Sequence, residues 1–399
     1  MALCLARYAA RRKGFTMSAR TVPPFRADHV GSFLRPAKLH AARTEHAGGA
    51  ITDEQLRAVE DEAVREIVAL QHEVGLRSVT DGEFRRATWH MDFVYQIGGI
   101  SKAPGNLLST FHNAQGDIAY TPDAIRVTRR LSMDKTIFGE AFAFLQSVAG
   151  TLVSRGNPRE TLVPKLTIPA PSMVHYRSGI RAVVDESVYP DVEEFWTDLG
   201  AAYHDEVRRL AAQGCRYLQL DDTSLAYVND PAQREYLAGR GEDAGHLYQR
   251  YIALTNAAVA DRPADMAVTT HLCRGNFRSS WVASGGYDFV AESLFNQLDV
   301  DGFFLEYDDE RSGGFEPLRF VPEGKQVVLG LVTTKRPELE SKDDLKRRIE
   351  EAAKYVPLDQ LCLSGQCGFA STEQGNALTA DDQKAKLELI VETAAEVWG

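Results

Sequence analysis

The sequence predicts one large (β/α)8 barrel with a long insertion between its second and third strands. Eight short apolar runs alternate with amphipathic stretches of helical periodicity from about residue 27 to the end of the 399-residue chain. No Pro-, Ser- or Gly-rich linker divides this span, so we expect a single domain over 27–399. An open, doubly wound sheet is the alternative, because it is built from the same alternation.

The expected strands and helices follow in a regular order. The strands are expected at 26–33, 79–84, 165–172, 215–222, 266–276, 302–308, 326–333 and 361–368. The clearest helix is 52–75, where Thr52 and Gln55 form a capping box and Gly75 closes the end. Further helices are expected at 192–214, near 244–260, and at 289–298, 343–356 and near 381–398. The insertion, 94–163, contains a helical segment near 137–149 and is expected to be a lid or side subdomain.

The N-terminal segment differs from the rest of the chain. Residues 1–26 contain six basic groups and no acidic group, which resembles a transit peptide in composition. A polar stretch follows Met17, so residues 1–16 can also be an extension upstream of an internal start site. We expect residues 1–26 to be such an extension or a disordered tail, and Cys4 belongs to it.

The composition excludes several classes of function. It is 44% hydrophobic and 25% charged, as in soluble globular proteins. A net charge of −11 argues against nucleic acid as a partner, and no run of about 18 apolar residues predicts a membrane span. The five cysteines are odd in number and widely spread, which fits a reducing cytoplasm and no disulfide framework. The sequence leaves the oligomeric state open, with a homo-oligomer among the possibilities.

The stretch VTTHLCRGNF at 268–277 places a histidine and a cysteine two positions apart near a strand end. Side chains at i and i+2 of a strand face the same side, so His271 and Cys273 can share one metal ion. Glu306 and Cys367 occupy equivalent places at the ends of later strands, and an N, S, S and O donor set favours zinc. The alternative is that Cys273 is a core residue, as we expect for Cys215 and Cys362. The YDDER run at 307–311 is expected to be a solvated loop.

Six motifs together resemble the cobalamin-independent methionine synthases, over nearly the whole chain from about residue 27. In chain order they are HVGSFLRP, TDGEFRR, LQLDD, HLC, FFLEYD and SGQCGF. The resemblance implies a zinc ion held by His271, Cys273, Glu306 and Cys367. It also implies that homocysteine binds this zinc as a thiolate and takes a methyl group from an N5-methyl folate, giving methionine. Zinc makes this nucleophile, because coordination deprotonates a thiol whose free pKa is about 8.5.

The resemblance also implies how the amino-acid end of homocysteine is held. Glu83 and Asp221 would bind its ammonium group, and the turn of Gly31 and Ser32 would bind its carboxylate. The alternatives are an ion pair of Glu83 with Arg85 or Arg86, and a capping role for Asp221, and Asp222 could share either role. Four protein ligands close a tetrahedron, so the substrate must displace one or expand the shell, and Glu306 is the ligand expected to yield.

The chain departs from the family where the methyl donor would bind. His175 or Tyr176 stands where the family has a tryptophan that stacks on folate, and Lys335 stands where it has a histidine proposed as a proton donor. Both can contact the donor or be ordinary rim residues, and the donor can be folate, a methylated corrinoid protein or a small methylated metabolite. Two other functions stay open: a zinc-dependent thiol alkyltransferase resembling the epoxide:coenzyme M transferases, and a non-catalytic barrel with structural zinc.

Overall fold

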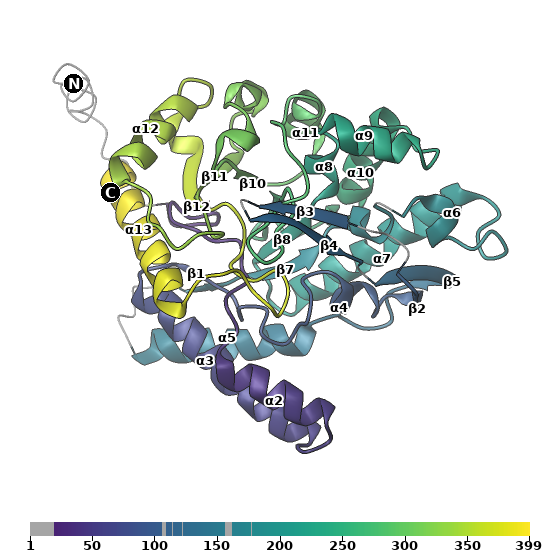
Figure 1. The fold of residues 1–399 in the computed structure, drawn as a ribbon, viewed down its shortest axis with the longest axis horizontal. Coiled ribbons are helices and arrows are strands. Elements are labelled where there is room, and N and C mark those ends of the chain that lie inside the picture. Colours follow the sequence, from purple (N-terminus) through teal and green to yellow (C-terminus); the bar gives the residue numbers. More distant parts are fainter. Residues whose placement is uncertain (1–19, 106–108, 114, 122, 156–161, 177) are drawn as a thin grey trace.

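The computed structural model describes residues 20–105, 109–113, 115–121, 123–155, 162–176 and 178–399, and its centre is a parallel β-barrel surrounded by helices (Figure 1). Six neighbouring strands form one parallel sheet in chain order. They are β7 (Leu166–Pro169), β8 (Tyr217–Asp222), β9 (Ala267–Leu272), β10 (Gly302–Glu306), β11 (Gln326–Val332) and β12 (Leu361–Gly365). All six are buried along most of their length, as expected for strands covered by helices on the outside.

The first two expected strands close the barrel but are shorter than predicted. Ala27 forms a single parallel bridge to Leu363 of β12, and β1 (Ser78–Val79) pairs with β6 (Val163–Pro164), which leads into β7. Each expected strand soon meets a glycine in the left-handed region, Gly31 at φ 133° and Gly82 at φ 69°. These glycines end the regular hydrogen-bonded pairing of the two strands. The chain therefore turns toward the site at an earlier residue than the apolar pattern predicts.

The helices agree closely with the expected positions. The capping box of Thr52 and Gln55 is present at the start of α3. The long helices, α3 (Asp53–Glu73), α5 (Gly139–Arg155), α7 (Val192–Ala212), α10 (Ala244–Val259), α12 (Lys342–Ala352) and α13 (Ala380–Trp398), surround the sheet together with α11 (Ala291–Gln297) (Figure 1). The other helices are α2 (Ala37–Ala47), α6 (Ile180–Val183), α8 (Ser224–Tyr227) and α9 (Pro231–Ala238). None of the helices among the described residues is long and apolar enough to cross a membrane.

The insertion contributes two antiparallel pairs of strands. After α4 (Met91–Val94), β2 (Gly98–Ala103) pairs with β5 (Ala124–Ser132), and β3 (Ser109–Asn113) forms a hairpin with β4 (Gly116–Tyr120). The helix expected near 137–149 is α5, which packs against α3 and β6 as a barrel helix. The β3–β4 hairpin crosses the view of the barrel in Figure 1, and His112 bridges to Trp281 of the loop that follows β9. The hairpin is therefore anchored beside the strand ends.

Within the N-terminal segment, the structure describes only residues from 20 onward. Residues 1–19, which include Cys4, lie outside the described residues. Phe25 is buried, and its backbone N–H donates to Asp28. Cys362 lies inside the barrel beside Val30 and Phe304, and Cys215 is equally buried, as expected for core cysteines.

Candidate active site

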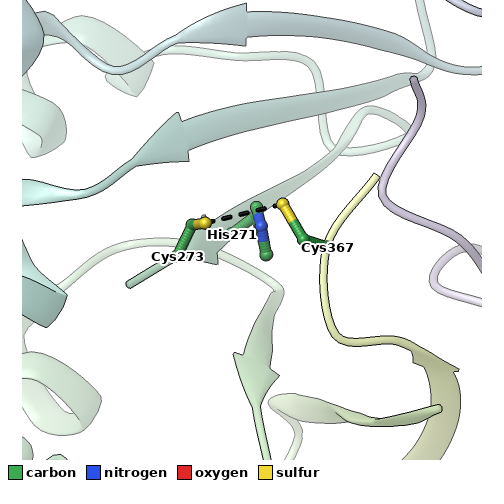
Figure 2. Close-up of side chains that lie close together, drawn as sticks. All are labelled: His271, Cys273 and Cys367. Atoms are coloured by element: carbon green, nitrogen blue, oxygen red, sulfur yellow. Dashed lines mark hydrogen bonds between the residues drawn. The ribbon is translucent and has the colours of Figure 1, made fainter. Parts of the chain in front are cut away.

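Three sulfur and nitrogen ligands converge at the carboxyl end of the barrel strands. His271 is on β9, Cys273 follows that strand, and Cys367 follows β12, and one ligand atom from each lies within 4.8 Å of the others. The two sulfur atoms are 3.5 Å apart (Figure 2). The i and i+2 spacing on β9 therefore presents both side chains to one point, and the parallel arrangement brings in Cys367 from the far edge of the sheet.

The geometry of this cluster fits a zinc ion. Two thiolates at ~2.3 Å from a tetrahedral zinc lie about 3.8 Å from each other, close to the 3.5 Å between Cys273 and Cys367. His271 is buried, and neither of its ring nitrogens has a hydrogen-bond partner in the described part of the chain. A buried imidazole without a partner is costly unless a ligand or metal satisfies it. The donor set, one imidazole and two sulfurs, is that of soft or borderline cations.

The electrostatics of the cluster favour one thiolate. The sulfur atoms of Cys273 and Cys367 share a hydrogen bond, which raises the pKa of Cys273 and lowers the pKa of Cys367 well below its usual value. Burial lowers the pKa of His271, but its neighbour Cys367 and two carboxylates raise it by more. The cluster is thus built to concentrate negative charge on sulfur, where a cation binds.

Glu306 ends β10 but its carboxylate lies outside the three-residue cluster. One oxygen accepts from Arg311 Nη2 at 2.7 Å and Lys335 Nζ at 3.0 Å, and the other from the backbone N–H of Arg274 at 2.9 Å. Burial raises the pKa of Glu306, but these three cationic residues outweigh it and hold the pKa far below its ordinary value. Glu306 is therefore an ionised carboxylate within the field of the cluster, and its role as a fourth ligand stays a prediction.

Residues 307–311 were expected to form a solvated loop, and that expectation is wrong for Tyr307, Asp308 and Arg311, although Glu310 is exposed. Asp308 is almost completely buried, and Arg311 is only 10% exposed at its side chain. Arg311 turns back to Glu306, and Asp308 accepts from Lys335 at 3.1 Å. A run of charged residues indicates a solvent-exposed loop only when no oppositely charged side chains pair with it in the interior. Here Asp308 and Arg311 form a buried network of ion pairs with Glu306 and Lys335.

Lys335 and His175, the two expected contacts of the methyl donor, are not among the described residues that line the cavity at the cluster. Lys335 is buried and occupied by Glu306 and Asp308. The Nδ1 of His175 lies 2.7 Å from the Tyr251 hydroxyl, and its ring packs edge-on against Trp196. The neighbouring Tyr176 does line the cavity. Of the two residues weighed for this position, the structure places the tyrosine at the site.

Glu83 lies in the wall of the same cavity in a rare backbone conformation, with φ 61°. The tight turn TDGEF directs its carboxylate inward, where one oxygen accepts from the Thr167 hydroxyl at 2.8 Å and lies 3.5 Å from Arg86. The other oxygen, Oε2, is buried without a hydrogen-bond partner in the region that the structure describes. Burial raises the pKa of Glu83. A buried carboxylate oxygen with no donor fits an incoming ammonium group.

Asp221 faces the cavity from the end of β8, beside His271 across the sheet. It accepts one hydrogen bond from Gln219, and burial raises its pKa to about 7. Asp222 instead accepts from Ser172 and Ser224 and from the backbone of the short helix α8. The capping role weighed for Asp221 therefore falls to Asp222, which leaves Asp221 directed at the cavity.

Ser32 completes this side of the cavity. Its hydroxyl packs against Gly368, where an added Cβ would lie only 1.9 Å from the Ser32 oxygen. Gly31 is equally confined, because a Cβ there would meet Thr167 at 2.7 Å. Gly368 therefore lets the loop of Cys367 approach Ser32 closely, and Gly31 lets the first strand approach Thr167 of β7. Both contacts help to position the Ser32 hydroxyl beside the loop that carries Cys367.

Four aromatic side chains that line the cavity were not predicted from the sequence. Trp89 follows the second expected strand, Phe111 and Tyr120 come from the β3–β4 hairpin, and Phe277 lies four residues beyond Cys273. Loops at the carboxyl end of barrel strands form the site, so the positions of Trp89 and Phe277 could have indicated them. The hairpin residues carry no such signal, because their arrival depends on how the insertion folds back.

Comparison with known proteins identifies the family. The model of the cobalamin-independent synthase catalytic domain matches residues 158–396. The Bacillus subtilis protein YxjH is 46% identical over 376 residues, which cover 94% of this chain and 95% of that protein. The chain belongs to the cobalamin-independent synthase family. Its match with a 5-methyltetrahydropteroyltriglutamate–homocysteine methyltransferase of Bacillus velezensis is weaker, at 25% identity, and spans 88% of this chain but 41% of that enzyme.

Two solved structures have a fold similar to that of this chain. A protein of Listeria monocytogenes, provisionally named a vitamin-B12-independent methionine synthase, is 36% identical, with a TM-score of 0.73 over 95% of this chain and all of that one. A B12-independent methionine synthase from a Shewanella species, solved with selenomethionine, has a TM-score of 0.66 at 18% identity, over 93% of this chain and 97% of that one. The barrel architecture expected from the sequence is thereby confirmed, and the family to which the chain belongs is one of methyltransferases. YxjH is described as uncharacterized, so the reaction must be argued from the site.

Proposed function

We propose that this protein is a zinc-dependent methyltransferase that methylates the thiol of homocysteine and releases methionine. The observation that carries this proposal is the convergence of His271, Cys273 and Cys367 in a buried cavity that also holds two inward-facing carboxylates, Glu83 and Asp221. The cysteines supply the soft ligands, and the carboxylates suit the ammonium group of an amino acid. Family membership supports the methyl-transfer chemistry.

His271, Cys273 and Cys367 would hold the zinc ion, with Glu306 as the candidate for a fourth position. When bound, zinc would lower the pKa of the substrate thiol and so supply a thiolate at neutral pH. Two cysteine thiolates would keep that centre rich in negative charge and its substrate sulfur nucleophilic. His271 is fixed by its place on β9, within the barrel core, so little reorganisation is needed on binding.

The other residues would orient the amino-acid end of the thiol. The unpartnered Glu83 Oε2 and the Asp221 carboxylate can each accept from the ammonium group, and charge-assisted hydrogen bonds of this kind are strong. The Ser32 hydroxyl is in reach of the same cavity and would donate to the carboxylate of homocysteine. A thiol bearing a sulfonate and no ammonium would lack partners for Glu83 and Asp221, so coenzyme M is disfavoured.

The test is the variant Cys273→Ser, with Cys215→Ser as a matched control in the barrel core. We expect Cys273→Ser to lose bound zinc and methionine formation together, because serine is a poor ligand at neutral pH. The control should keep both, since Cys215 is buried just before the start of β8, at the opposite end of that strand from Asp221. Retention of full zinc content by Cys273→Ser would contradict the proposal. Loss of zinc without any effect on homocysteine binding would favour a structural metal in a non-catalytic barrel.

A further inference from the structure

One wall of the cavity is built from aromatic rings supplied by the insertion and by the loop that follows Cys273. Phe111, Tyr120 and Phe277 all line the cavity. The Tyr120 and Phe277 rings stack with centroids 4.7 Å apart, and Phe111 packs against them at 6.4 and 5.2 Å. We call these three side chains the aromatic wall. Trp89 and Tyr176 add further rings to the same cavity.

The aromatic wall is held in place by the backbone. The N–H of Trp281 donates to His112, and the N–H of His112 donates to Trp281, which pins the β3–β4 hairpin to the loop carrying Phe277. Because Phe277 is four residues from Cys273, the wall and the metal ligands belong to one connected unit. The rings therefore line the same cavity as the sulfur ligands.

The ionisable side chains that line the cavity are predominantly acidic. Four carboxylates line it, those of Glu83, Asp123, Asp221 and Asp222, whereas no lysine or arginine does so among the residues that the structure describes. Two nearby cations are already occupied: Arg86 by Glu83, and Lys335 by Glu306 and Asp308. An anionic ligand entering this space would meet carboxylates without a compensating guanidinium or ammonium group.

We propose that the methyl donor is a small onium cation, a sulfonium or quaternary ammonium compound, bound against the aromatic wall. This inference rests on the proposed methyltransferase function and specifies its second substrate. Aromatic faces attract cations through their negative quadrupole, and desolvation in a cavity strengthens the attraction. Asp123, which borders Tyr120 and the cavity, adds a negative charge beside the wall.

The chemistry of such a donor matches the groups available. The thiolate sulfur attacks the methyl carbon, a new S–C bond forms, and the bond from that carbon to the positive sulfur or nitrogen breaks. The electron pair of the broken bond returns to the onium atom, which departs as a neutral sulfide or amine. The leaving group needs no proton, so the reaction does not depend on Lys335, which Glu306 and Asp308 hold away from the cavity. One negative and one positive charge disappear together in this step.

A methylated folate with a polyglutamate tail is the contrasting donor. Its tail carries several carboxylates, and its methylated nitrogen leaves well only when it is protonated. The described lining of this cavity offers carboxylates where such a tail would require lysine or arginine. Charge complementarity therefore favours the onium class over a polyanion.

The first test compares two probes of the same shape and different charge, choline and 3,3-dimethylbutan-1-ol, by calorimetry with the zinc-loaded full chain. We expect choline to bind at least tenfold more tightly. Tyr120→Leu and Phe277→Leu should each reduce that preference severalfold, while Tyr355→Leu, at an exposed tyrosine elsewhere on the barrel, should not. Circular dichroism establishes that each variant is folded. A double variant, Tyr120→Leu with Phe277→Leu, that keeps the full preference for choline over 3,3-dimethylbutan-1-ol overturns the proposal. Equal affinity for the two probes overturns it as well.

The second test follows the conversion of homocysteine with a 13C-labelled carbon chain into methionine, with S-methylmethionine or 5-methyltetrahydropteroyltriglutamate as the methyl donor. Labelled methionine from the sulfonium donor, inhibited by choline and weakened in Tyr120→Leu, is the expected result. Transfer from the folate alone, unaffected by choline, overturns the proposal while leaving the methyltransferase function intact. Failure of homocysteine to change the zinc environment would overturn the methyltransferase function instead, so the two failures are distinguishable.

Discussion

Replacing Lys335 with methionine tests whether this residue serves Glu306, as the structure indicates, or the methyl donor. Its ammonium group lies 3.0 Å from Glu306 and 3.1 Å from Asp308, with 5% of the side chain exposed. A pair at 3 Å attracts by about 5 kcal/mol at an effective dielectric constant near 20. Removing one partner of a buried pair typically costs about 3–5 kcal/mol. Because Glu306 keeps Arg311 and the Arg274 N–H, we expect a loss of about 3 kcal/mol in the free energy of unfolding.

The assay is equilibrium unfolding in urea, with Lys346→Met as the matched control. Lys346 also contacts two carboxylates, Asp343 and Glu396, but all three side chains are substantially exposed. Pairs of this kind contribute no more than about 1 kcal/mol. A loss below 1 kcal/mol for Lys335→Met, equal to that of the control, would refute the reasoning. If Lys335→Met raised the KM for the methyl donor and left the free energy of unfolding unchanged, Lys335 would instead contact the methyl donor.

Two further predictions concern pH and metal removal. Burial raises the pKa of Glu206 to about 8, so this carboxyl is protonated in the folded state while the unfolded chain releases its proton near pH 4.5. Stability should therefore fall by about 5 kcal/mol as pH rises from about 4.5 to 8, at about 1.4 kcal/mol per pH unit. Glu206→Gln should abolish most of this fall in urea unfolding between pH 5 and 9. If the free energy of unfolding of Glu206→Gln depended on pH as strongly as that of the parent chain, this prediction would be contradicted. Chelation of the metal should make two thiols, Cys273 and Cys367, newly reactive to a thiol reagent on a Cys4→Ser background, and no increase on chelation would show that neither sulfur binds metal.

The strands and helices could be predicted well where periodicity alone determines them. The capping box at Thr52 and the apolar face of the following helix specify α3 to within two residues at its C-terminal end. The spacing of His271 and Cys273 likewise determines a shared direction, because strand geometry has a period of two. Strand order then brings Cys367 to the same rim. These features depend on local geometry and on the regular order of a parallel barrel.

Other features depend on contacts that no local pattern encodes. The carboxylate of Glu306 turns to Arg311 and Lys335, which lie 5 and 29 positions further along the chain. The short first strands follow from left-handed glycines, and Gly368 is required by the approach of Ser32 from the other end of the sequence. The aromatic wall requires the insertion to fold back over the rim. For Lys335, for Gly368 and for the hairpin, the deciding partner is distant in sequence, so periodicity and spacing could not identify it.

The central claim is that this barrel activates a thiol at a zinc ion held by His271, Cys273 and Cys367. The most direct measurement is zinc-edge X-ray absorption on the purified protein with and without homocysteine, counting sulfur neighbours near ~2.3 Å. We predict two sulfur neighbours for the protein alone and three after addition of the thiol. A count that stays at two when homocysteine is added at saturating concentration would contradict thiol activation at this site.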